Sequence, residues 1–419
     1  MKVRNKKHEK RVKRMIVACG LCAIILTAST YAWFIGFKTV NVTAFDVKIA
    51  AIDSLSLSLD GETFADTVEI NETNYNDPAV VYEGHTNSWG GEGLVPMSSV
   101  GKIDTTVSRM ILYEKGSFTV TPGGYRIMAS RVENEGASEA RGYVAFDLFI
   151  KNLSGNAYYS TNNVLNEEAI YLTPESEVAV ATGGTNNEEN SGIENSVRVA
   201  FAQIGRVKAT ETNVTNITGI TCTGTDPVTG ICDDTHTQIW EPNDTKHVQN
   251  AVNWYTTSCK ARTGADLTLA ASYSGVCGTV ADGTAYPTYA VSGEILETDR
   301  VDAYDGAEYN GYTDSIADTA TVGKLMKYDY FTDTMRDYKG NNRPEFMTLA
   351  PNSITKVRIY IYLEGQDVDN YDFASLGKKI TVAFGFTKER YYGEDIDYNS
   401  AEPHGPELPS NVNARPARP

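Results

Sequence analysis

The chain of 419 residues has a formal net charge of −17, and 41% of its residues are hydrophobic, which is enough to build a core and excludes wholesale disorder. The charge is divided, because residues 1–14 hold eight Lys/Arg and one Glu, and the rest of the chain holds 29 Lys/Arg against 53 Asp/Glu. Neutralising phosphates requires clustered basic residues, so this acidic remainder argues against nucleic acid as a partner.

An uncharged run of 23 residues, 15–37, follows the basic segment 1–14. As a helix it is long enough to cross the hydrocarbon core of a bilayer. Because the positive charge lies on its N-terminal side, we expect the N-terminus in the cytoplasm and the rest of the chain outside. Cys19 and Cys22 fit this run as two small apolar residues better than as redox or zinc ligands.

Two interpretations of residues 15–37 stay open. The run is either a permanent membrane anchor or a signal peptide that signal peptidase removes. The region Thr30, Tyr31, Ala32 and Trp33 has the small-x-Ala pattern of a cleavage site. Both interpretations predict an extracellular or cell-surface protein, attached to the membrane through residues 15–37 before or without cleavage.

From residue 39 onward the pattern is that of β-strands. Apolar and polar residues alternate over 45–49 and 55–59, which indicates strands with one buried and one solvent-exposed face. Residues 110–113 and 118–121 are predicted to form a hairpin across 114–117. Further strands are predicted at 142–151, 196–207, 354–363 and 380–387.

Amphipathic helices are scarce after residue 38, and 322–335 is the one modest candidate. Many strands without alternating helices indicate a mainly β fold, an antiparallel β-sandwich over residues 38–388 preceded by the N-terminal hydrophobic helix. Long polar loops are predicted to decorate it as insertions with minor strands of their own. These insertions cover about 62–105, 174–194, 208–285 and 299–340. Residues 389–419 form a Pro-rich tail that we expect to be disordered.

The four cysteines after the apolar run are Cys222, Cys232, Cys259 and Cys277. An even number of cysteines in an extracellular region indicates two disulfides, with three pairings open. Local closure favours Cys222–Cys232 and Cys259–Cys277. Each of these disulfides would close a loop of about ten to twenty residues and stabilise the fold by roughly 3 kcal/mol through lost entropy of the unfolded state. The spacing lacks the CxxC pattern of zinc sites.

No catalytic signature is present in the chain. The HExxH, GxSxG, Walker and GxGxxG patterns are all missing, so we do not expect an enzyme. A hydrolase that uses a pair of carboxylates is the least favoured alternative, since a sequence does not fix the separation of two acidic side chains.

One acidic turn is a weak candidate for calcium, and no other cofactor is expected. Asp367, Asp369, Asn370 and Asp372 crowd the turn after the strand 354–363. Calcium takes six to eight oxygen ligands, but the run lacks the glycine and the final glutamate of an EF-hand loop. A solvated acidic turn is therefore favoured over a metal site.

The stretch TASTYAWFIGFKTVNVTAFDVKIAA at 27–51, with its box Thr30-Tyr31-Ala32-Trp33-Phe34, resembles the TasA/camelysin-like secreted surface and biofilm-matrix proteins of Gram-positive bacteria. The late run 354–386 is similar to their paired C-terminal strands. The resemblance implies an alternate signal peptide cut by a dedicated signal peptidase, a jelly-roll-like sandwich, and polymerisation by donation of the N-terminal strand. This chain departs from the family in its length, its four cysteines and its large insertions.

Strand donation also has a physical basis in the residues. After cleavage, 33–50 would be a free alternating segment, and an unpaired sheet edge accepts such strands. The leading hypothesis is an exported, non-enzymatic cell-surface or extracellular-matrix structural protein that self-associates into fibres. The alternative is a single-pass, membrane-anchored adhesin or receptor ectodomain, and the third is an extracellular hydrolase.

Overall fold

The computed structural model describes sixteen stretches of the chain. They are residues 41–51, 54–71, 94–121, 124–133, 139–154, 158, 167–180, 192–232, 237–262, 280–296, 304–305, 308–309, 312–313, 325–338, 343–371 and 376–388. The apolar run 15–37, with the cleavage region, and the tail 389–419 lie outside them. Within these stretches no helix has the length and apolar character needed to cross a membrane.

The first of two large sheets contains the N-terminal strand. Its order is β22–β11–β24–β1–β3, and β12 also pairs with β24. The bounds are β1 Asn41–Ala51, β3 Thr67–Ile70, β11 Glu168–Leu172, β12 Glu177–Val180, β22 Met347–Leu349 and β24 Leu376–Lys388. β1 runs parallel to β24 and antiparallel to β3, so strands from the two ends of the chain lie side by side.

The second sheet has the order β2–β10–β23–β13–β15–β21. Its strands are β2 Leu55–Ser58, β10 Val144–Asn152, β13 Val197–Lys208, β15 Thr237–Glu241, β21 Phe331–Thr332 and β23 Ser353–Glu364. Three short strands extend it, with β14 (Thr229–Gly230) on β13, β4 (Pro96–Ser98) on β23, and β7 (Tyr113–Glu114) on β4. The antiparallel ladder β10–β23–β13 forms its centre.

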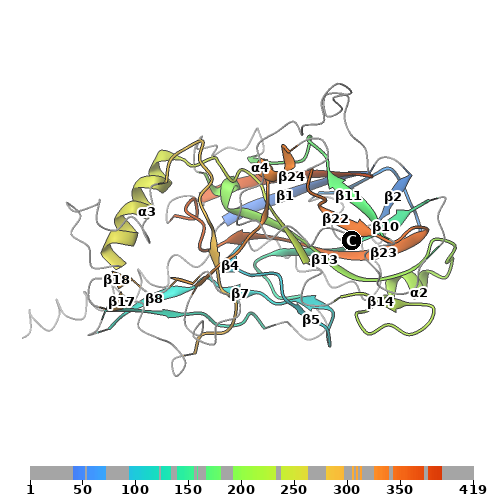
Figure 1. Ribbon diagram of the computed structural model, residues 1–419, viewed down its shortest axis with the longest axis horizontal. Coiled ribbons are helices and arrows are strands. Elements are labelled where there is room, and N and C mark those ends of the chain that lie inside the picture. Colours follow the sequence, from blue (N-terminus) through green and yellow to red (C-terminus); the bar gives the residue numbers. More distant parts are fainter. Residues whose placement is uncertain are drawn as a thin grey trace, which may run out of the picture.

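Shorter elements form a third layer on the far side of the second sheet, below β13 and β23 in Figure 1. They include β5 Ile103–Asp104, β6 Arg109–Met110, β8 Ser117–Thr121, β9 Gly124–Met128 and α2 Val214–Thr218. The other elements are η2 Ile193–Ser196, α3 Gln249–Arg262, α4 Asp333–Arg336, β16 Tyr289–Ala290, β17 Tyr304–Asp305, β18 Glu308–Tyr309, β19 Tyr312–Thr313 and β20 Leu325–Lys327. α3 stands at one end of the molecule, next to the ends of the sheets.

The main core lies between the two large sheets. Side chains of β1 and β24 meet those of β10, β13 and β23 in one cluster of buried apolar residues. Phe201 of β13 is at its centre, with ring centroids 4.8 Å from Phe346 and 5.1 Å from Phe384 in edge-to-face geometry. Such pairs add about 0.5–1.5 kcal/mol to the burial of their area.

The second sheet is covered on its outer face too. A second cluster there joins Ile103, Met110 and Ile217 of the third layer to residues of β10, β13 and β23. As a result all twelve residues of β23 are buried. The predicted solvent-exposed face is present in β1, where Lys48 is exposed, but in β2 the polar Ser58 is fully buried.

The prediction of a mainly β fold is confirmed, and the predicted long strands correspond to β1, β2, β10, β13, β23 and β24. The sheets are mixed rather than purely antiparallel, because β1–β24, β15–β21 and β4–β23 are parallel pairs. No tight turn joins these partners along the chain, so nothing requires an antiparallel arrangement.

Two local predictions are wrong. The hairpin of 110–113 with 118–121 does not form, because β7 pairs with β4 and β8 pairs with β9. The helix predicted over 322–335 is limited to Asp333–Arg336, and the strands β20 and β21 precede it. The predicted insertion 208–285 also supplies β15 to the second sheet and contains α3, a helix that its polar sequence did not indicate.

Candidate functional site

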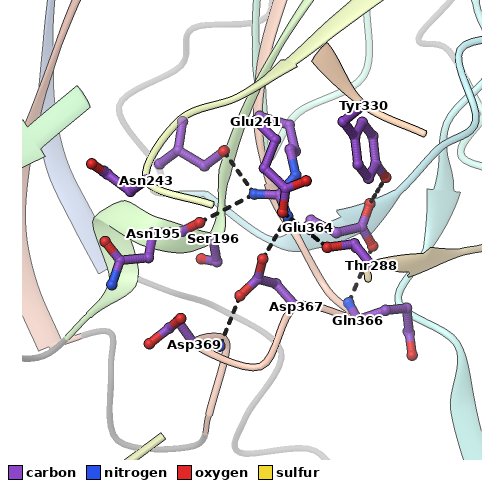
Figure 2. A network of polar contacts seen from close by, with 12 residues as sticks. Asn195, Ser196, Glu241, Asn243, Thr288, Tyr330, Glu364, Gln366, Asp367 and Asp369 are labelled. Atoms are coloured by element: carbon purple, nitrogen blue, oxygen red, sulfur yellow. Dashed lines mark hydrogen bonds and ion pairs between the residues drawn. The ribbon is translucent and has the colours of Figure 1, made fainter. Parts of the chain in front are cut away.

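A buried group of charged side chains lies where β23 ends. It contains Arg198, Glu241, Tyr330, Glu364 and Asp367, which we call the Arg198 cluster. Figure 2 labels the other four residues of this cluster. Arg198 comes from β13, Glu241 from the end of β15 and Glu364 from the end of β23, and the turn after β23 supplies Asp367. Adjacent strands ending at the same edge of the sheet therefore bring the group together.

Arg198 is fully buried and is the centre of the cluster. Its Nη2 lies 2.5 Å from Glu241 Oε1 and 2.5 Å from Asp367 Oδ2, and Nη1 donates to the carbonyls of Asn195 and Val197. The guanidinium also lies 5.0 Å from the centroid of the Tyr330 ring. A buried cation with two carboxylate partners is held by both charge and hydrogen bonds, which is the geometry that offsets its desolvation.

Glu364 is the second buried acid of the cluster. Its Oε2 accepts a hydrogen bond from the Tyr330 hydroxyl at 3.2 Å, and its Oε1 accepts one from the backbone N–H of Gln366 at 3.1 Å. Burial raises the pKa of Glu364 to about 7. Burial likewise raises the pKa of Glu241 to about 7, despite the nearby Arg198. Burial therefore makes the charged form of both carboxyl groups less favourable than it is in water.

His247 and Asp369 form an ion pair beside the cluster. His247 Nδ1 is 2.8 Å from Asp369 Oδ2, and its Nε2 is 3.1 Å from the carbonyl oxygen of Thr284. Both ring nitrogens face acceptors, which favours the doubly protonated imidazolium. Burial opposes the charge, but the hydrogen bond to Asp369 and the charges of Asp369 and Asp367 together outweigh it and hold the pKa of His247 above its ordinary value.

The space among these groups is small. The cavity lined by Glu241, Asp244, His247, Asp367 and Asp369 has a volume of about 10 Å³. A volume of this size holds about one water molecule and no sugar ring or peptide. The arrangement can store protons and fix the turn after β23 against β13 and β15.

The predicted calcium residues have other partners. Asp367 binds Arg198 and accepts from the backbone N–H of Asp369 at 2.8 Å, and Asp369 binds His247 and accepts from the N–H of Val248 at 3.1 Å. The Asn370 amide donates to the carbonyl of Glu364. Asp372 lies outside the described part of the chain, within which no group of three or more His, Cys, Asp or Glu residues is placed to hold a metal ion.

A wider pocket of about 70 Å³ adjoins the cluster on the side of α3. Aromatic side chains line it, with Trp254 and Tyr255 from α3 and Tyr286 and Tyr289 from the segment that leads into β16. Lys115, Pro287, Leu325, Asn370 and the turn residues 365–368 complete the lining. We call this the aromatic pocket.

Of the predicted disulfides, the structure describes one. Cys222 and Cys232 are bonded, with their Cα atoms 5.2 Å apart. They close a turn on the outer face of the second sheet, beside Ile220. The side chain of Cys259 and all of Cys277 lie outside the described residues, as do Thr30, Tyr31, Ala32 and Trp33.

Sequence reasoning did not find Arg198, Glu241, Tyr330 or His247. One signal was present, because Arg198 is the one charged residue in the run Val197–Ala202 (VRVAFA) of a predicted strand. A charge inside such a strand indicates a buried partner. Comparison of the chain with protein-family models, curated proteins and solved structures finds no match.

Proposed function

We propose that this chain is an exported, non-enzymatic structural protein of the cell surface or extracellular matrix, and that copies assemble by donating the N-terminal strand. The fold proposed for it is a jelly-roll-like sandwich, the two large sheets being its layers. The observation that carries the proposal is the position of β1, the strand that follows the apolar run 15–37 most closely.

β1 occupies a slot inside the first sheet. It forms a parallel ladder with β24 from Asn41 to Ala51 on one side and an antiparallel ladder with β3 on the other. Val47 and Ile49 point into the main core and are fully buried. A strand held by backbone ladders and two core side chains leaves a complementary slot when it is withdrawn, and the same strand of a second copy fits that slot.

The connection after β1 constrains such an assembly. Only residues 52–54 separate β1 from β2, which belongs to the second sheet. Three residues span at most about 10 Å. A copy that donates β1 must therefore lie directly against its acceptor, and the repeated head-to-tail contact produces an open filament.

The charged groups support a structural role. The Arg198 cluster encloses a cavity of about 10 Å³, so its carboxylates have no room for a saccharide substrate. Export through residues 15–37 agrees with an acidic body and with the Cys222–Cys232 disulfide, because disulfides persist in oxidising compartments.

Cysteine cross-linking tests strand donation directly. Asp46 and Thr381 face each other in the β1–β24 ladder, and both side chains are half-buried. In a background with Cys259→Ser and Cys277→Ser, we expect oxidised Asp46→Cys/Thr381→Cys filaments to give a ladder of covalent oligomers. A matched control is Ala179→Cys/Thr381→Cys, which uses the same residue of β24 but pairs it with β12.

The control pair should cross-link within one chain under all conditions. If Asp46→Cys/Thr381→Cys also gives only internal cross-links, and electron microscopy of residues 33–419 shows no filaments, strand donation is wrong. The mature N-terminus tests export separately. Mass spectrometry should find Tyr31 or Trp33 as the first residue, whereas a retained Met1 would indicate the membrane-anchored ectodomain.

A further inference from the structure

The aromatic pocket combines flat rings with a single cationic side chain. Tyr255 and Tyr286 meet edge to face with centroids 5.2 Å apart, and their hydroxyl groups are hydrogen-bonded to each other. Trp254, Tyr286 and Tyr289 are only partly buried, so their rings contribute to the pocket wall. Half-buried aromatic rings whose hydroxyl groups are held by hydrogen bonds form a rigid binding surface.

One segment of this chain has the matching chemistry. Pro403, Pro406 and Pro409 recur every third residue in PHGPELP. A polyproline II helix has three residues per turn, so these three prolines share one face of it. Grooves lined by aromatic side chains bind such helices, because the segment is extended before it binds and loses little entropy.

The charges of the two surfaces are complementary. Lys115 is exposed at the rim of the pocket, with its Nζ 3.5 Å from the Asn370 carbonyl oxygen. Glu407 lies between the second and third prolines of the repeat. A cation on the pocket and an anion within the segment set the orientation of a bound segment.

The distances favour docking between two copies. β24 begins six residues after Asn370 of the pocket and runs for 13 residues, roughly 40 Å away from it. The 14 residues 389–402 reach at most about 50 Å when fully extended. To reach the pocket of its own chain, the segment 403–409 would need residues 389–402 to be almost fully extended. Binding to the pocket of a neighbouring copy does not need this extension.

We propose that the aromatic pocket binds the segment 403–409 of a second copy as a polyproline II helix. The contact would add a second link between copies of the chain to the proposed assembly. It rests on the proposed function only because it requires copies of the chain to associate. It does not depend on strand donation, so the two are separable by experiment.

Peptide binding tests the pocket without any assembly. A fluorescent peptide of residues 402–410 is titrated into the full chain with Pro403→Ala/Pro406→Ala/Pro409→Ala, whose own tail does not compete. We expect saturable binding that Tyr286→Ala weakens about tenfold or more and Lys115→Glu weakens about fivefold. Lys102→Glu, an exposed lysine outside the pocket lining, is the matched control and should bind as tightly as the parent.

A charge exchange identifies the partner of Lys115. A peptide with Glu407→Lys should bind the Lys115→Glu chain better than the native peptide does, and a peptide with all three prolines replaced by alanine should not bind. Equal binding to the parent and both pocket variants would overturn the proposal. Pocket-dependent binding of a neutral oligosaccharide without binding of the peptide would also overturn it, because a sugar would then be the occupant.

Association of whole chains tests the contact between copies. With β1 locked by the internal Asp46→Cys/Thr381→Cys disulfide, strand donation is blocked. Sedimentation velocity should still show self-association, and the triple Pro→Ala change should abolish it. A locked chain that stays monomeric at all concentrations, although the chain with the triple Pro→Ala change binds the peptide, would overturn docking between copies.

Discussion

The two faces of β23 are equally buried but by different means. Val357, Ile359, Ile361 and Leu363 point into the main core between the sheets. The opposite face carries Lys356, Arg358, Tyr360, Tyr362 and Glu364. Burial of the first face depends on area and shape, and burial of the second depends on the pairing of individual atoms.

Pairing on the polar face is extensive. Arg358 holds Asp147 of β10 in a bidentate contact with Nε–Oδ1 2.7 Å and Nη2–Oδ2 3.0 Å, and Lys356 Nζ lies 3.1 Å from the same carboxylate. At the other end of the strand, Arg198 holds Glu241 and Asp367. A polar face buried in this way is costly to disturb on one side only, because an unpaired charge remains.

The largest effect is expected for Arg198→Met. The change keeps much of the side-chain volume but leaves the carboxylates of Glu241 and Asp367 without their counter-charge. We expect a loss of about 3–5 kcal/mol in the free energy of unfolding, measured by urea titration. Adding Glu241→Gln should restore part of the loss. If Arg198→Met lowers the free energy of unfolding by less than about 1 kcal/mol, the polar face stabilises the fold through its buried area and not through the pairing of its charges.

The apolar face should respond to volume instead. Ile359 is fully buried and lies opposite Phe146 and Phe201 in the two flanking ladders. Ile359→Ala should cost about 3 kcal/mol and Ile359→Val about 1 kcal/mol, since the cost follows the cavity that is left. Both losses should be independent of pH, and a strong pH dependence would contradict the assignment of this face to apolar packing alone.

The periodicity of the sequence predicted the apolar face well. Alternation identified Val47 and Ile49 of β1 as residues of a buried face, because a period of two depends only on neighbours in the chain, and the apolar Val357 and Ile359 recur at the same period in β23. The same pattern does not show whether the second face of β23 meets solvent or protein. It could not show that elements distant in sequence, such as β6 and α2, cover that face.

For the Arg198 cluster, the sequence indicated which residue types gather in the turn after β23 but not which side chains pair with them. The turn after β23 was identified as a concentration of side-chain oxygens, and a solvated acidic turn was favoured over a calcium site. That interpretation is wrong, because the side chains of Asp367 and Asp369 are buried. The partners of Asp367 and Asp369 are Arg198 and His247, which lie 169 and 122 residues away in the sequence. No local pattern relates such residues, so their pairing requires the three-dimensional fold.

A smaller effect is expected from Glu364→Gln. Its dependence on pH distinguishes the polar face of β23 from the apolar face. The pKa of Glu364 is about 7 in the folded chain and close to 4.5 when unfolded, so the folded state binds the proton more tightly. This contribution to stability is present at low pH and is lost as the pH rises from about 4.5 through 7.

The parent chain should therefore be more stable at pH 5.5 than at pH 8, as measured by the urea midpoint. Glutamine keeps the carbonyl acceptor without the charge and should reduce this difference by about 2 kcal/mol. The exposed Glu62→Gln is the control and should leave the difference unchanged. A parent chain whose stability rises between pH 5.5 and 8 would contradict the burial of these acids.

The smallest effect is expected for an ion pair of similar geometry that water reaches. Arg131 Nη2 lies 2.9 Å from Asp104 Oδ2, but 37% of the Arg131 side chain and 24% of the Asp104 side chain are exposed. A double-mutant cycle with Arg131→Ala and Asp104→Ala should give a coupling energy of about 0.5 kcal/mol that 0.5 M salt removes. The cycle is required because Asp104 also accepts hydrogen bonds from Thr106. A coupling energy above about 2 kcal/mol would mean that contact geometry, not exclusion of water by the third layer, determines the strength of the ion pairs on the polar face.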